Sequence, residues 1–96
     1  MASLKVTLTA VVDRSFPTWG RFEFVDASGE TIVIEEKLPI VGVHEEELNI
    51  PMAVVLECTV VSKENGSKKI DTSQPYGVSD MKGRMQFQVN SELIVE

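Results

Sequence analysis

The stretch GRFEFVDASGETIVIEE, residues 20–36, carries the clearest fold signal in this 96-residue chain. Its first half places Phe22 and Phe24 on one face of an extended segment and charged residues on the other, a two-residue period that is typical of a strand with one buried face. In the turn that follows, Asp26 can accept hydrogen bonds from its own backbone, and Gly29 can adopt a positive φ. The β-branched residues after it favour a second strand. The stretch therefore predicts a β-hairpin.

The same alternation of apolar and polar residues recurs on both sides of this hairpin. Residues 4–12 (LKVTLTAVV), 53–61 (AVVLECTVV) and 85–90 (MQFQVN) each show a period of two, which predicts three more strands. Asn65-Gly66 is the strongest short hairpin signal in the chain, and it leads into a short polar strand over residues 68–73. Six strands follow from these patterns.

Length and composition limit the architecture that these strands can form. The chain has 43% hydrophobic, 25% charged and only 6% aromatic residues, which indicates one globular domain with a core built mainly of aliphatic side chains. We predict a single all-β domain over residues 1–96, a small six-stranded antiparallel barrel or sandwich with at most one short helical turn. The expected core residues are Val6, Leu8, Phe22, Phe24, Ile32, Ile34, Leu56, Val60, Phe87 and Val89.

The net charge of −6 is unevenly distributed along the chain. Residues 23–57 hold nine acids and one base, a local balance of −8. Such a segment repels a phosphate backbone, so we expect no binding to nucleic acid. We expect instead that any protein partner is basic and docks on the acidic segment.

The acidic triplet Glu45, Glu46 and Glu47 follows the only histidine, His44. Adjacent residues cannot all face one metal ion, so we interpret this segment as a solvated turn, with its glutamates in the rim of a partner-binding surface. The sequence predicts no catalytic residue, no metal site and no cofactor. The single cysteine, Cys58, lies in an apolar run and is expected to be a buried, unreactive thiol.

Two aromatic residues in turn regions leave alternatives open. Trp19 lies between Pro17 and Gly20, and Tyr76 lies between Pro75 and Gly77. Each either packs against an end of the barrel or contacts a partner, because exposed aromatic side chains are frequent anchors of interfaces. For both residues we favour the first interpretation. The loop around Tyr76 then crosses the barrel end, and Tyr76 acts as a plug.

Nothing in the sequence directs the chain to a membrane or to export. Residues 1–12 contain Lys5 and alternating threonines and so lack the continuous apolar core of a secretion signal. No window approaches the roughly 18 apolar residues of a membrane span. We therefore expect a cytoplasmic protein.

The order of elements resembles that of short uncharacterised bacterial β-barrel proteins of about 100 residues. The segments that carry the resemblance are GRFEFVDASGE, EEKLPIV, AVVLECTVVS, DTSQPYGVSD and MQFQV. The family has no assigned activity, so the resemblance implies no catalytic residue. Small acidic proteins of this kind can act as immunity proteins against toxins, an analogy of size and charge.

Together these observations favour a non-enzymatic protein-binding module, with Trp19, Tyr76 and the three glutamates as the expected contact residues. The alternative is a small-molecule binder or modest enzyme with a pocket at the barrel mouth, near Trp19, Tyr76 and His44. Self-association also stays open.

Overall fold

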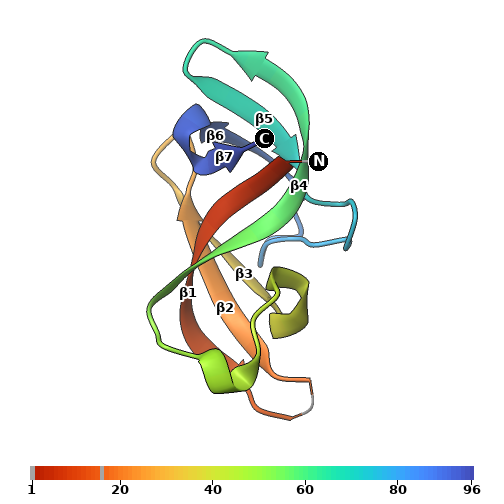
Figure 1. Cartoon of the computed structure of the whole chain (residues 1–96). Coiled ribbons are helices and arrows are strands. Elements are labelled where there is room, and N and C mark those ends of the chain that lie inside the picture. Colours follow the sequence, from red (N-terminus) through yellow and green to blue (C-terminus); the bar gives the residue numbers. More distant parts are fainter. Residues whose placement is uncertain (1, 16) are drawn as a thin grey trace.

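In the computed structural model, residues 2–15 and 17–96 are described, and their strands form one antiparallel sheet that curls into a half-barrel (Figure 1). Short 3-10 turns connect some of the strands. The strands are β1 (Ala2–Asp13), β2 (Trp19–Val25), β3 (Thr31–Lys37), β4 (Met52–Glu64), β5 (Ser67–Asp71), β6 (Gln86–Asn90) and β7 (Ile94–Val95). The 3-10 turns are η1 (Leu38–Val41), η2 (Glu45–Glu47) and η3 (Ser91–Leu93).

The long central strand β1 organises the sheet, whose order is β3-β2-β1-β4-β5-β6. Its N-terminal half pairs with β4 from Ala2 to Leu8, and its C-terminal half pairs with β2 from Thr7 to Asp13. The short β7 pairs with the N-terminal end of β1, at Ser3 and Leu4. β2 and β7 therefore lie one after the other along the same edge of β1, and β4 lies along the opposite edge.

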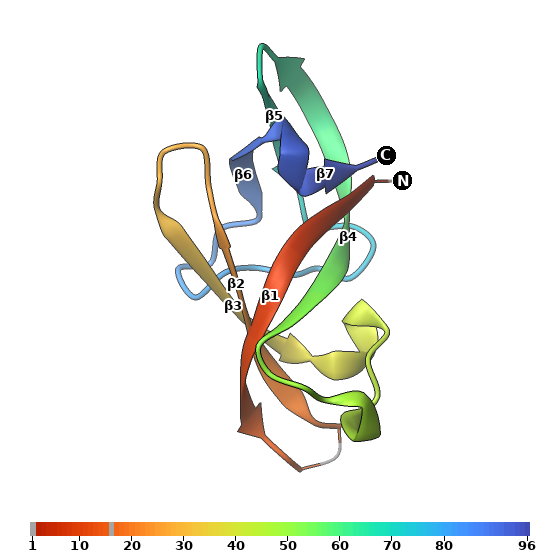
Figure 2. The same cartoon turned by 60° about the vertical axis from the view of Figure 1, so that its left-hand side comes forward.

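The β2–β3 turn and the β5–β6 loop lie on the open side of the half-barrel (Figure 2), and two backbone hydrogen bonds span this side. The Ala27 N–H, in the β2–β3 turn, donates to the Gln88 carbonyl of β6 over 2.8 Å. The Met81 N–H, in the β5–β6 loop, donates to the Val33 carbonyl of β3 over 3.0 Å. The edge strands β3 and β6 are thus joined through a turn and a loop, so the backbone groups of both edges have partners there.

The core confirms the two-residue periodicity of the sequence. Nine of the ten expected core residues are buried, and the tenth, Val60, is partly buried and packs against the core. Phe24 and Phe87 meet edge to face with their ring centroids 5.3 Å apart, a favourable arrangement for an aromatic pair. Gly20 is required by packing, because a Cβ there would lie 2.6 Å from Leu8 Cδ1.

The all-β prediction is confirmed, and the structure adds detail at the turns. The expected helical turn is η2, while η1 begins next to Pro39 and η3 precedes β7 in the tail. A seventh strand of two residues joins the six that the sequence predicted. None of the described residues lies in a helix that is long and apolar enough to cross a membrane.

Candidate functional site

Two five-residue turns, DASGE (26–30) and DMKGR (80–84), have the same hydrogen-bond pattern. In each, the N–H of the aspartate, Asp26 or Asp80, donates to the carbonyl of the fifth residue, Glu30 or Arg84, over 2.9 Å. The aspartate Oδ1 accepts the N–H groups of the third and fifth residues over 2.7 to 3.0 Å. The glycine at the fourth position has a positive φ, 90° and 80°, which glycine adopts without strain. Both turns are therefore rigid for the same local reason.

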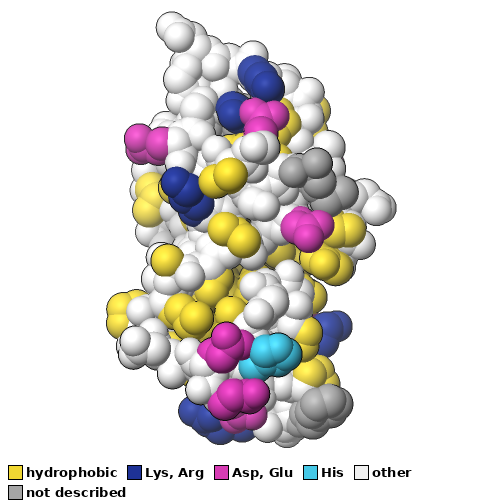
Figure 3. Space-filling view, in the orientation of Figure 1, with side chains coloured by type: hydrophobic (Ala, Val, Ile, Leu, Met, Phe, Trp, Pro, Cys, Tyr) yellow, Lys and Arg dark blue, Asp and Glu magenta, His cyan; other side chains and the backbone are white. Residues whose placement is uncertain are grey.

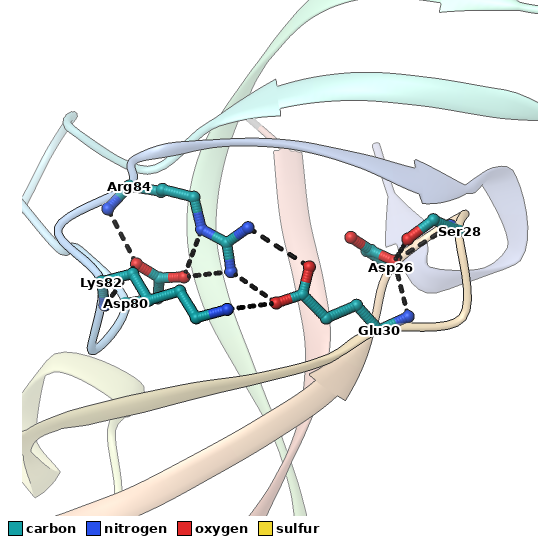
Figure 4. A network of polar contacts seen from close by, with 6 residues as sticks. All are labelled: Asp26, Ser28, Glu30, Asp80, Lys82 and Arg84. Carbon is teal, nitrogen blue, oxygen red and sulfur yellow. Dashed lines mark hydrogen bonds and ion pairs between the residues drawn. The ribbon is translucent and has the colours of Figure 1, made fainter.

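The fifth residues of the two turns face one another and form a network of ion pairs (Figure 4). Arg84 donates to Glu30 Oε2 over 3.0 Å and, through Nε, to Asp80 Oδ2 over 2.7 Å. Lys82 Nζ donates to the same Glu30 oxygen over 3.1 Å. We call these four residues the clasp. It fastens the β2–β3 turn to the β5–β6 loop.

The clasp perturbs the acidity of its members. Hydrogen bonds from Arg84 and Lys82 lower the pKa of Glu30 to about 2. Burial of Asp80, whose side chain is 2% exposed, acts to raise its pKa, but the hydrogen bonds from Arg84 and Lys82 outweigh burial and hold the pKa below its ordinary value. The carboxylates of the clasp are therefore ionised at neutral pH.

A groove of about 580 Å³ lies where β2 separates from β1. Its floor is formed by β1 around Val6 and by Phe24 of β2. One wall contains Val25 and Thr31, the two residues that flank the DASGE turn, and η3 forms the other wall with Leu93. Figures 1 and 2 show the β2–β3 turn leaving β1 on one side, with η3 and β7 across from it.

The groove exists because β1 lacks a neighbouring strand over two residues on this side. Pairing with β7 ends at Leu4 and pairing with β2 begins at Thr7, so Lys5 and Val6 have no strand partner there among the described residues. Both keep their partners in β4 on the opposite side. Successive residues of a strand direct their N–H and C=O groups to opposite sides, so one of the two directs them into the groove. We call this position the gap.

The groove is lined by both apolar and charged side chains. Val25 and Leu93 expose apolar surface there, Val6 and Phe24 are buried beneath it, and Lys5, Glu23 and Glu92 bring three charges to its border. The Glu23 carboxylate accepts a hydrogen bond from the Thr9 hydroxyl over 2.9 Å, which fixes its position. The border therefore carries two carboxylates against one ammonium group.

The acidic triplet lies in η2 and does not border this groove. Figure 3 shows acidic side chains beside the histidine, at the lower end of the molecule. Two carboxylates of the triplet have structural partners. Glu45 accepts hydrogen bonds from Arg14 over 2.8 Å and from the Thr18 hydroxyl over 3.1 Å. Glu47 accepts the backbone N–H of His44 over 2.9 Å and so caps its own turn. Glu46 is exposed. The predicted solvated turn is present, and two of its three carboxylates accept hydrogen bonds from other groups of the protein.

The two aromatic residues also lie outside the groove. Trp19 begins β2 and is partly buried, with Lys37 Nζ 5.5 Å from its ring centroid. Tyr76 is 47% exposed, whereas Val78 is 1% exposed and belongs to the core. The Thr72 hydroxyl donates to the Val78 carbonyl over 2.7 Å and draws that residue inward. The prediction that Tyr76 plugs the barrel end is therefore wrong, because Tyr76 is exposed and Val78 is the residue of this loop that packs in the core.

Sequence reasoning did not find the groove or the clasp. The repeated pattern D-x-x-G-x in DASGE and DMKGR was the one available signal for the clasp. No local pattern marks the groove, since it depends on where two distant strands end along β1.

Comparison with family models, with curated proteins and with solved structures finds no match to this chain. Within residues 2–15 and 17–96, no group of three histidine, cysteine or acidic side chains is placed to hold a metal ion. The functional proposal therefore rests on the geometry of the groove.

Proposed function

We propose that this chain is a non-enzymatic binding module that takes up a segment of a basic partner protein in the groove. The observation that carries the proposal is the groove itself, which has an apolar floor and an excess of carboxylate at its border. Basic side chains on the partner complement Glu23 and Glu92, and the net charge of −6 attracts a basic protein during its approach. Cytoplasmic residence and an immunity-like role are consistent with this proposal and stay predictions.

A small-molecule ligand is the second candidate function, and the size of the groove favours it. Ligand pockets have volumes of about 300 to 1,000 Å³, and this groove has about 580 Å³. Such pockets, however, bury most of the ligand surface, whereas this groove is open to the solvent. An open groove beside an unpaired stretch of strand suits a segment of chain better than a small ligand.

The test uses a displayed library of random peptides, selected on the wild-type protein. Ala53 borders the groove and is exposed on β4, so Ala53→Arg places a long cationic side chain in the site. Val61→Arg is the matched control, because Val61 is also exposed on β4 but does not border the groove.

We expect selected peptides rich in Lys and Arg, with affinity reduced about tenfold or more by Ala53→Arg, which corresponds to 1.4 kcal/mol or more, and left nearly unchanged by Val61→Arg. Groove residues that shift in NMR spectra with small fragments, while no peptide is enriched, support the second candidate. Equal effects of the two arginine substitutions on every selected peptide contradict the groove as the site.

A further inference from the structure

We propose that the partner segment binds as an extended strand, pairs its backbone with β1 at the gap, and alternates apolar and basic residues. This inference rests on the proposed function, since it names the conformation and chemistry of the segment that occupies the same groove. Three features of the groove carry it: the length of the gap, the arrangement of the groove side chains, and the rigidity of the walls.

The gap has room for the central residues of an extended segment, whose two ends leave the edge of β1 where β7 and β2 begin to pair. Three residue steps separate Leu4, the last partner of β7, from Thr7, the first partner of β2. At about 3.4 Å per residue this is about 10 Å of strand edge. Lys5 and Val6 are held straight from the other side by their unbroken register with Val55 and Val54 of β4. A peptide residue placed there can exchange hydrogen bonds with whichever of the two directs its backbone into the groove, as in other cases of strand addition.

The side chains of the groove select an alternating sequence. In an extended peptide, successive side chains point to opposite faces. One set meets the apolar surface that Val25 and Leu93 expose, and the other set meets the carboxylates of Glu23 and Glu92. A peptide in which valine or isoleucine alternates with lysine or arginine therefore satisfies both kinds of surface.

Both walls are fixed in the free protein. The clasp and the Ala27–Gln88 hydrogen bond hold the β2–β3 turn in place. On the opposite wall, the Ser91 N–H, at the start of η3, donates to the Gly66 carbonyl over 3.1 Å. A groove with rigid walls loses little conformational entropy on binding, so even a short segment retains measurable affinity.

The experiment uses the wild-type protein and the peptide acetyl-Gly-Val-Lys-Val-Lys-Val-Gly-amide, followed by NMR titration and calorimetry. A peptide of the same composition with its lysines adjacent removes the alternation, and a Val-Glu-Val-Glu-Val analogue reverses the charge. Two further versions carry an N-methyl group on one central residue or on its neighbour, which removes a single backbone donor without changing the side chains.

We expect the parent peptide to bind with a dissociation constant below about 1 mM and to shift the amide signals of Lys5 and Val6. One N-methylated version should lose about tenfold in affinity and the other much less, because only alternate residues of the peptide face β1. The charge-reversed analogue should bind more weakly than the parent. Glu23→Gln with Glu92→Gln should weaken binding and flatten its salt dependence, whereas Glu46→Gln with Glu64→Gln, both at exposed positions outside the groove, should not.

The possible failures are distinguishable. If the parent and both N-methylated peptides bind equally well in the groove, strand pairing is wrong while the proposed function stands. If the rearranged peptide binds as well as the parent, the alternating preference is wrong. If none of these peptides binds but library-selected peptides bind at the groove, the proposal that the segment is extended and alternates apolar and basic residues is wrong. If a second copy of the chain occupies the groove, as shown by a concentration-dependent dimer that Ala53→Arg dissociates, the partner assignment is overturned.

Discussion

Replacing Asp80 with alanine should remove the central support of the clasp. The Asp80 side chain accepts the N–H groups of Lys82 and Arg84 over 3.0 and 2.7 Å, and it also accepts Arg84 Nε–H over 2.7 Å. Alanine leaves two backbone donors and one guanidinium without this acceptor at a position where the side chain is only 2% exposed. The substitution therefore removes the side-chain hydrogen bonds that hold the turn, and it also removes one of the two carboxylates of the clasp.

The expected loss in the free energy of unfolding follows from these contacts. Each hydrogen bond contributes about 1 kcal/mol net, and a buried donor left without a partner costs about 1 to 3 kcal/mol. Some water will reach the turn, so we expect a total of about 3 kcal/mol for Asp80→Ala. Asp80→Asn keeps the Oδ1 acceptor but loses the charge that faces Arg84, and it should cost about half as much.

Asp26→Ala is the matched control, because Asp26 holds the equivalent turn in the same way. Its carboxylate accepts the N–H groups of Ser28 and Glu30 and the Ser28 hydroxyl, and it forms no ion pair among the described residues. The residue is only partly buried. We expect a loss of about 1 kcal/mol, as for other short-range caps of backbone donors. Urea denaturation followed by circular dichroism measures all three variants. Equal losses for Asp80→Ala and Asp26→Ala would refute the view that the ion pairs of the clasp add to the turn.

The pH dependence of stability tests the same network. Hydrogen bonds from Arg84 and Lys82 lower the pKa of Glu30 to about 2, and the pKa of Asp80 is also lowered. A carboxylate with a lower pKa in the folded state contributes stability that is complete above its unfolded pKa, near 4, and is lost as the pH falls towards the folded value. The urea midpoint should therefore be constant between about pH 6 and 8 and fall between about pH 5 and 2. Glu30→Gln combined with Asp80→Asn should make this fall shallower, though not abolish it, because Glu96 and Asp71 also have lowered pKa values.

Four further outcomes are expected. Phe87→Ala should cost about 3 to 5 kcal/mol, because Phe87 is buried against Phe24, and a loss below about 1 kcal/mol in urea denaturation would place it on the surface. Val78→Ala should cost about 2 kcal/mol and Tyr76→Ala less than about 1, since only Val78 is in the core; the reverse order would restore the tyrosine plug. Burial, with the nearby Glu96 charge, raises the pKa of Cys58 to about 11, so the thiol should react with an aromatic disulfide reagent only after unfolding, and rapid reaction of the native protein would contradict its burial. Fluorescence anisotropy should show no binding to mixed-sequence single-stranded DNA or RNA at physiological salt, because the acidic surface repels phosphates, and salt-sensitive binding at micromolar concentration would show this to be wrong.

The strands of this protein were predictable because their signal is local. Alternation along β1 and β4 places every second residue on the buried face, and the turns at Asp26 and Asn65 reverse the chain where the sequence indicates. Turn chemistry depends on neighbouring residues only, so it can be recognised without knowledge of the fold. The prediction of an all-β chain with a core of aliphatic residues followed from these two kinds of pattern.

The loop before β6 shows where such reasoning stops. Tyr76 and Val78 are two residues apart in an irregular segment, so no periodicity distinguishes the buried residue from the exposed one. Thr72 distinguishes the two residues, because its N–H donates to the Met85 carbonyl while its hydroxyl donates to the Val78 carbonyl. These bonds connect residues up to 13 positions apart, and sequence patterns carry no information about them.

The expected contact residues were chosen for exposed charge and aromatic character, and the structure shows why this choice missed the groove. A carboxylate in a turn can accept a hydrogen bond from a backbone N–H of the same turn, as Glu47 does from the N–H of His44. The groove instead lies where pairing with β7 has ended at Leu4 and pairing with β2 has not yet begun at Thr7, and this depends on strands far apart in the sequence.

Turn rigidity and the shape of the groove have a common origin in this protein. Val25 and Thr31 line the groove, and they flank the DASGE turn whose last residue, Glu30, is held by Arg84. A carboxylate that forms ion pairs with two cations in a rigid turn restricts the directions in which the wall can move. The clasp therefore acts on the groove through the turn that joins β2 to β3, although none of its four residues borders the site. The two aspartate turns stabilise the half-barrel, and by the same contacts they keep open the groove in which we place the partner.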